Sequence, residues 1–191
     1  MKFNELNAEQ QAAAIEIHRD INVDHQDWHE YVKCTHHSNL EAVGFDGVES
    51  AYSGFWSQGD GASFTASSLD IEKFLRSQKR WTYYRVLHEM IRINELWVKV
   101  VRTTHRYCHE NTTQAELHGE HYLNLTPRQE KFYEELEKEI DAYITNAGQE
   151  YYSALNTSYN NMTSDEEVKE SIIANEMEFE EDPRESCVTY L

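Results

Sequence analysis

The stretch Tyr52-Ser-Gly-Phe-Trp-Ser-Gln-Gly-Asp-Gly-Ala-Ser-Phe-Thr65 decides the fold that we expect, and it holds three of the seven glycines in the chain. Its strand-forming aromatic residues are Tyr52, Phe55, Trp56 and Phe64. The glycines between them are typical of a turn, because glycine readily adopts φ > 0. We therefore predict a β-hairpin over about residues 48–66, with an aromatic face that forms a nucleus for helices on either side. The motif consists of Phe55, Trp56, Gln58, Gly59, Asp60, Gly61 and Phe64.

The core of this stretch, F-W-S-Q-G-D-G-A-S-F at residues 55–64, resembles a motif of many uncharacterised bacteriophage proteins. Some of these proteins are loosely labelled as antitoxins of a toxin–antitoxin stability system. The likeness extends to residues 69–71, to a Tyr-x-His pattern at 107–109 and to residues 150–152. The resemblance covers most of residues 45–180 thinly, and only the ten-residue core is specific. It implies a phage context, and it carries over no catalytic residues because that family has no settled activity.

The composition indicates a globular protein that is neither secreted nor embedded in a membrane. A chain of 191 residues with 39% hydrophobic residues can bury a core, so we predict one domain over residues 1–180 with an acidic, loosely held tail at 181–191. No apolar run reaches the roughly 20 residues that span a bilayer, and residues 1–7 lack the apolar core of a signal peptide. The scattered cysteines form no CxxC pair, which favours reduced thiols in a cytoplasm, here that of a host cell. They are Cys34, Cys108 and Cys187.

The patterns along the chain predict a mainly helical α+β fold. We expect helices over about residues 4–22, 27–42, 71–78, 81–97 and 126–155, and a last helix from about 163. The clearest helix start is Thr126-Pro127 with Gln129, because it combines a capping residue, a first-turn proline and a capping-box partner. The segment 96–107 is rich in β-branched residues, which favours a strand that pairs with 112–118 and joins the hairpin in a small antiparallel sheet.

Net charge is the strongest compositional feature. The chain has 35 acidic and 17 basic residues, a formal net charge of −18. Such a charge repels nucleic acid and anionic membranes and favours basic protein partners, although a solvated acidic surface in a phage or halotolerant protein gives the same balance. The segment 72–108 is the exception, with nine bases and three acids. Its bases either pair internally with neighbouring helices or form a second binding face.

Acidic residues recur along the predicted helix that starts near residue 126. Glu130, Glu134, Glu137 and Asp141 follow one another at three or four residues, so their charges repeat roughly every 4.5–6 Å. Duplex DNA presents one phosphate per about 1.7 Å of axis, so a DNA mimic would need a second acidic helix. We predict a partner-binding acidic surface composed of Glu130, Glu134, Glu135, Glu137, Asp141, Asp165, Glu166 and Glu167.

Histidines and the motif itself offer alternative chemistry. The histidines at metal-ligand spacings are His25, His29, His105, His109, His118 and His121, with Cys108 beside His109. None lies in an HExxH context, so we predict no metal and no cofactor. Asp60 is expected to bond its local turn rather than to act as a catalytic carboxylate. The aromatic residues of the motif form either a core or a platform that stacks on a base.

We therefore expect a phage-encoded acidic protein, not an enzyme, that binds and inhibits a host protein. The target would be a nucleic-acid-handling defence factor with a basic surface, as for anti-restriction or anti-CRISPR proteins, without direct binding to nucleic acid or membrane. Two other classes remain open: an antitoxin-like partner that binds through apolar contacts, and a small metal-dependent hydrolase that uses histidines and Asp60. The oligomeric state cannot be predicted from these patterns.

Overall fold

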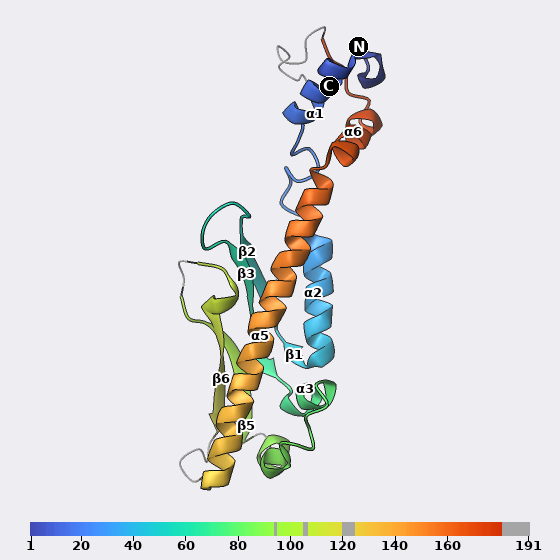
Figure 1. The fold of residues 1–191 in the computed structure, drawn as a ribbon. Coiled ribbons are helices and arrows are strands. Elements are labelled where there is room, and N and C mark those ends of the chain that lie inside the picture. The colour runs from blue at the N-terminus through green and yellow to red at the C-terminus, as the bar shows by residue number, and fades with distance from the viewer. Residues whose placement is uncertain (94, 105–106, 120–124, 181–191) are drawn as a thin grey trace. The chain divides into compact units, whose positions relative to one another are not determined.

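The computed structural model describes residues 1–93, 95–104, 107–119 and 125–180 (Figure 1). The predicted tail at 181–191 lies outside the described residues. The described chain combines helices with short antiparallel strand pairs, which confirms the α+β class. Among the described helices, none combines the length and the apolar character that a membrane span requires.

The chain divides into two compact units. Unit 1 contains residues 1–31 and 155–191, and unit 2 contains residues 32–154. The longest helix, α5 (Pro127–Met162), contributes residues to both units. The boundary between the two units at residues 154 and 155 falls within this continuous helix, so the expected single domain over residues 1–180 stays a prediction.

Unit 2 contains the predicted hairpin. Strands β2 (Glu49–Ser53) and β3 (Gly61–Thr65) pair antiparallel, with Tyr52 opposite Ala62, so the hairpin is confirmed. Phe64 on β3 is 1% exposed. Its ring meets that of Phe45 edge-on at a centroid distance of 5.4 Å. Phe64 is therefore the motif residue that anchors the hairpin in the core.

The other two aromatic residues of the motif do not lie in a strand, so that part of the prediction is wrong. Phe55 and Trp56 belong to the connection between β2 and β3, and Trp56 is 78% exposed. The carboxylate of Asp60 accepts the backbone N–H of Trp56, which takes this amide out of the strand ladder. Phe55 instead packs its ring against Tyr52 and Tyr152, at centroid distances of 6.0 and 5.6 Å.

The remaining strands form separate pairs rather than the expected sheet of three or four strands. Strand β1 (Phe45–Asp46) pairs with β4 (Ser68–Leu69), and β5 (Leu96–Arg102) pairs with β6 (Thr113–Gly119), all antiparallel. Within the described residues, an isolated antiparallel bridge between Ala66, just after β3, and Val100 links the hairpin to β5. The predicted pairing between the segments 96–107 and 112–118 is confirmed for residues 96–102 with 113–119, and residues 105–106 lie outside the described residues.

The predicted helix over 81–97 is wrong. In its place, a 3-10 turn η2 (Arg85–Leu87) leads into the short helix α4 (His88–Arg92), and β5 begins at Leu96. The apolar spacing is helical as far as Ile91. From Leu96 onward, buried and exposed residues alternate, which is the period of a strand.

Helices α2 (Glu30–Val43), α3 (Ile71–Ser77) and α5 match the predictions more closely. Helix α2 ends before Gly44, whose φ of +115° suits glycine. Asp70 caps α3 through the backbone N–H of Lys73, at 2.9 Å. Thr126 and Gln129 cap α5 reciprocally, with the Thr126 N–H donating to Oε1 of Gln129 at 2.9 Å.

The core of unit 2 lies between α5, α2, α3 and the strands. Figure 1 shows α2 on one side of α5 and the β2–β3 and β5–β6 pairs on the other. The apolar stripe of α5 is fully buried at Leu136, Ile140 and Ile144. A short 3-10 turn, η3 (Glu110–Thr112), connects the segment after β5 to β6. This arrangement places the β6 backbone against the N-terminal half of α5.

Unit 1 is a small helical unit built from both parts of the chain. It contains η1 (Phe3–Glu5), α1 (Ala8–Ile17) and α6 (Asp165–Ala174). Its buried apolar residues are Phe3, Leu6, Ala14, Val168, Ile172 and Phe179. Two large apolar residues of this unit are exposed, Tyr31 at 84% and Ile173 at 39%.

The first helix of unit 1 is shorter than the predicted span 4–22. Asn7 caps its start by accepting the N–H of Gln10, and the helix ends at Ile17. Residues 20–24, Asp-Ile-Asn-Val-Asp, are all weak helix formers, which explains the turns that follow.

Candidate functional site

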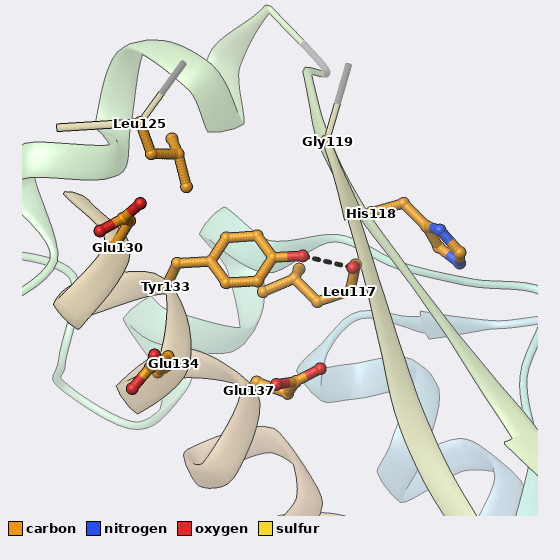
Figure 2. Close-up of a pocket in the computed structure, with 8 residues that line it drawn as sticks. All are labelled: Leu117, His118, Gly119, Leu125, Glu130, Tyr133, Glu134 and Glu137. Carbon is orange, nitrogen blue, oxygen red and sulfur yellow. Dashed lines mark hydrogen bonds between the residues drawn. The ribbon is translucent and has the colours of Figure 1, made fainter. Parts of the chain in front are cut away.

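A hollow between β6 and α5 gathers three of the predicted acidic residues. Its volume is about 780 Å³. It is lined by Leu117, His118, Gly119, Leu125, Glu130, Tyr133, Glu134 and Glu137 (Figure 2). The hydroxyl of Tyr133 donates a hydrogen bond to the backbone oxygen of Leu117, which ties α5 to β6 at the floor of the hollow. The hollow therefore has an apolar and aromatic floor with carboxylates along one wall.

The three carboxylates come from successive turns of one helix face. Glu130, Glu134 and Glu137 line the hollow, and no lysine or arginine is among its described lining residues. Burial raises the pKa of Glu137, and the negative charges of Asp141 and Glu134 raise it further, while Lys138 opposes them. The raised pKa of Glu137 therefore reflects burial first and repulsion between neighbouring carboxylates second.

His118 is the one residue with a basic side chain among the described lining residues, and its imidazole ring points away from the hollow. Figure 2 shows the ring on the opposite side of β6 from Tyr133. It stacks on Trp97 at a centroid distance of 4.1 Å, and its Nε2 lies 3.5 Å from a carboxylate oxygen of Glu116. His118 contributes its backbone to the hollow and its imidazole to the outer face of the β5–β6 pair.

Two other residues of the predicted acidic surface serve the fold of unit 2. Asp141 accepts the backbone N–H of Ala115 at 2.6 Å, which fastens β6 to α5. Glu135 accepts the hydroxyl of Tyr83 at 2.8 Å and lies 3.8 Å from the ammonium of Lys131. These two carboxylates therefore have partners within the protein.

The last three predicted acidic residues belong to unit 1. Asp165, Glu166 and Glu167 form the first turn of α6 and are exposed. Ser164 caps this turn by accepting the N–H of Glu167, and Arg19 pairs with Asp165. Acids at a helix N-terminus stabilise the helix, so a role within unit 1 already accounts for this group. The predicted surface is thus split between the two units.

Glu139 is a structural acid that the sequence reasoning missed. It accepts the hydroxyl of Tyr84 at 2.7 Å and pairs with Arg80 at 3.2 Å. Burial raises the pKa of Tyr84, and the hydrogen bond to Glu139 raises it further.

Arg76 and Arg92 also pair with an acid, Glu72, so part of the basic segment 72–108 is neutralised within unit 2. The excess of bases in this segment of the sequence could have predicted that some of them pair with acidic residues of unit 2.

Asp60 acts as a turn residue, as expected. Its Oδ2 accepts the backbone N–H groups of Trp56 at 2.9 Å and Ser57 at 2.7 Å. The same segment is closed by the N–H of Asp60 donating to the oxygen of Ser57 at 3.1 Å. This carboxylate therefore organises the connection between β2 and β3.

The two glycines beside Asp60 allow another segment to approach the hairpin closely. A Cβ at Gly61 would lie 2.4 Å from the Cβ of His109, a distance that side chains do not tolerate. Gly59 has a φ of +97°, and a Cβ there would lie 3.3 Å from the ring of Tyr107. The Gly-Asp-Gly sequence thus permits the contact between the hairpin and the Tyr-x-His segment.

The candidate metal ligands are not assembled among the described residues. Within those ranges, no group of three or more His, Cys, Asp or Glu side chains is placed to hold a metal ion. His25 and His29 belong to unit 1, and His109 uses its Nδ1 to accept the N–H of Asn111 at 3.2 Å. His105 and His121 lie outside the described residues.

Together, the fold and the hollow define an acidic α+β protein with a carboxylate-lined concavity beside its longest helix. Residues 28–165 match the model of a protein family described as Domain of unknown function (DUF8835), and the chain belongs to this family. The matched region includes the hairpin motif and all residues of the hollow. The comparisons with curated proteins and with solved structures give no match.

Proposed function

We propose that this chain is a phage-encoded inhibitor that binds a basic, nucleic-acid-handling defence protein in the cytoplasm of the host. Targets of this kind include restriction enzymes and CRISPR-type complexes, whose clefts are basic because they hold nucleic acid. The observation that carries the proposal is the hollow lined by Glu130, Glu134 and Glu137, whose described lining residues include no lysine or arginine. The phage context rests on the resemblance of the F-W-S-Q-G-D-G-A-S-F motif.

The chemistry of the hollow suits a lysine or arginine side chain of the partner. Such side chains bury an apolar stem and keep a charged head near polar groups. Leu117, Leu125 and Tyr133 provide apolar contact, and the glutamates provide the opposite charge. Burial is the main cause of the raised pKa of Glu137, but repulsion from Asp141 and Glu134 adds to it, and an incoming cation would offset that repulsion.

Net charge supports the same proposal at longer range. A protein with a formal charge of −18 attracts a basic partner before contact, which speeds association and makes it sensitive to salt. The acidic face of α5 alone supplies fewer charges than the phosphates of duplex DNA. Mimicry of DNA is thus proposed as a match to the basic surface of the partner rather than as a copy of the double helix.

The two other classes receive less support. A hydrolase that uses Asp60 is disfavoured because the Oδ2 atom of this residue already accepts two backbone N–H groups. An antitoxin-like partner protein would bind through apolar contacts, and its binding would survive high salt. The salt dependence of binding therefore distinguishes an antitoxin-like protein from the proposed inhibitor.

The test is affinity capture from a bacterial lysate followed by competition with DNA. The hollow variant carries Glu130→Gln, Glu134→Gln and Glu137→Gln. The control variant removes the same charge at three exposed acids, Glu9, Glu41 and Glu49, that lie outside the hollow. The captured protein is identified by mass spectrometry, and its binding to fluorescent duplex DNA is measured with and without each variant.

We expect the wild type and the control variant to capture a DNA-binding protein at low salt and to displace its DNA. The hollow variant should bind it about tenfold more weakly, equivalent to about 1.4 kcal/mol. The proposal fails if the hollow variant inhibits as well as the wild type, or if no partner is captured. Capture of a protein that is retained at high salt by all three forms would support the antitoxin-like class instead.

A further inference from the structure

A second, smaller cleft lies beside the hairpin motif in unit 2. Its volume is about 270 Å³. It is lined by Ser53, Ser57, Gln58, Gly59, Asp60, Arg102, Tyr107 and Cys108. The residues from Ser53 to Asp60 come from the end of β2 and the connection to β3, and Arg102 is the last residue of β5. Tyr107 and Cys108 belong to the segment whose close approach to the hairpin Gly61 permits. The motif therefore forms one wall of a polar cleft.

Arg102 is the cation of this cleft, and it lacks a carboxylate partner among the described residues. Its Nη2 lies 3.9 Å from the Sγ of Cys108, and its buried Nε has no hydrogen-bond partner. Ion pairs do form at several other arginines, namely Arg19, Arg76, Arg80 and Arg92. A guanidinium is always charged and presents five N–H donors, so Arg102 retains donors for a ligand.

The rest of the lining is polar and compatible with an anion. Ser57 and Gln58, which are polar residues, also line the cleft, and the Ser53 hydroxyl donates to the backbone oxygen of Cys108 at 3.4 Å. Asp60 is the one acid among the described lining residues, and two backbone N–H groups offset the charge on its Oδ2. Positive charge in the cleft is therefore concentrated on Arg102.

We propose that this cleft binds a small oxyanion, a carboxylate or a phosphate, through the guanidinium of Arg102. Planar guanidinium groups bind both anions with paired N–H donors. The volume lies just below the roughly 300–1,000 Å³ of pockets for drug-sized ligands, which suits a small anion or the end group of a larger ligand. This site is separate from the acidic hollow and takes a ligand of opposite charge.

Isothermal titration calorimetry at constant ionic strength tests the proposal, with inorganic phosphate and acetate as separate probes and chloride as the reference salt. The variant Arg102→Gln removes the guanidinium, and the control Arg92→Gln removes an equal charge from an exposed ion pair on α4. We expect saturable binding of one probe by the wild type and the control. Arg102→Gln should bind about tenfold more weakly or worse, as expected for the loss of a charge-assisted contact. Saturation by phosphate or by acetate tells which anion the site prefers.

Thiol protection in the wild-type protein provides a test that needs no variant. Because Cys108 lies 3.9 Å from Arg102, a bound anion should slow its alkylation by iodoacetamide. Cys34 is exposed on α2 and serves as the internal reference in the same digest. The proposal is overturned if neither probe binds saturably, if Arg102→Gln binds like the wild type, or if the anion changes alkylation of Cys108 and Cys34 equally.

Discussion

Protonation of the buried histidine on α2 should destabilise unit 2 at mildly acidic pH. His36 is 9% exposed, and its ring stacks on that of Tyr151 with a centroid distance of 4.3 Å and an interplanar angle of 10°. Its Nε2 has no hydrogen-bond partner among the described residues. Burial, and to a smaller extent the neighbouring His37, lowers the pKa of His36 to about 4. The folded protein thus favours the neutral imidazole.

The direction and size of the effect follow from this pKa. The ordinary pKa of His36 is 6.5 and its folded value is about 4, so between these values the unfolded chain binds the proton more readily. The stabilisation is present above about pH 6.5 and is lost as the pH falls toward 4. A shift of this size corresponds to about 3 kcal/mol in full, of which about 2 kcal/mol is lost by about pH 5.

The assay compares urea unfolding of the wild type and His36→Phe at about pH 7.5 and pH 5. Phenylalanine keeps the ring stack on Tyr151 and cannot be protonated. We expect the wild type to lose about 2 kcal/mol more than His36→Phe over this interval. The control His88→Phe replaces another stacked histidine. The centroid of its ring lies 3.6 Å from that of the Trp81 ring, and its Nε2 forms a hydrogen bond with the backbone oxygen of Trp81. The reasoning is refuted if His36→Phe loses as much stability as the wild type.

Three further substitutions test the contacts around the motif and α5 by urea unfolding. Gly61→Ala should cost about 1–3 kcal/mol, because the new methyl group overlaps His109. Asp60→Ala should cost about 1–3 kcal/mol, because two backbone N–H groups lose their acceptor, whereas Asp60→Asn keeps an acceptor oxygen and should cost less. Asp141→Ala should cost about 1–3 kcal/mol by leaving the Ala115 N–H without its acceptor.

Each of these substitutions has a matched comparison. For Gly61, the control is Gly54→Ala, whose Cβ would meet only the Asp60 carboxylate, at 3.2 Å, and should cost less. For Asp60, equal stability of the alanine and asparagine variants would contradict the acceptor role. For Asp141, the control is Glu134→Ala, which removes a carboxylate of the same helix that accepts no backbone N–H among the described residues. Equal losses of stability in Asp141→Ala and Glu134→Ala would show that removal of a charge, rather than loss of the hydrogen bond to β6, causes the destabilisation.

Local signals in the sequence predicted the parts of the fold that depend on neighbouring residues. The start of α5 follows from Thr126 and Gln129, because capping involves residues three apart. The hairpin follows from glycines that permit the turn. By contrast, the exposure of Trp56 depends on the carboxylate of Asp60 bonding its backbone N–H, and no propensity scale reports that bond.

The candidate site shows the same limit. The spacing of Glu130, Glu134 and Glu137 on one helix face could be read from the sequence, since helical periodicity is local. The separate role of Asp141 could not, because its partner, the N–H of Ala115, comes from a strand 26 residues earlier. The cleft at Arg102 was missed because three separate chain segments must meet to form it.

The order in which the chain is synthesised has different consequences for the two units. Unit 2 is one continuous segment, so all residues of its core are available once residue 154 has left the ribosome. Unit 1 buries Phe3 and Leu6 together with Ile172 and Phe179. Its first apolar residues must therefore remain without their final partners until almost the whole described chain has been made. Contacts across so long a separation form slowly, which makes the N-terminal segment the part of a nascent chain most exposed to chaperones and proteases.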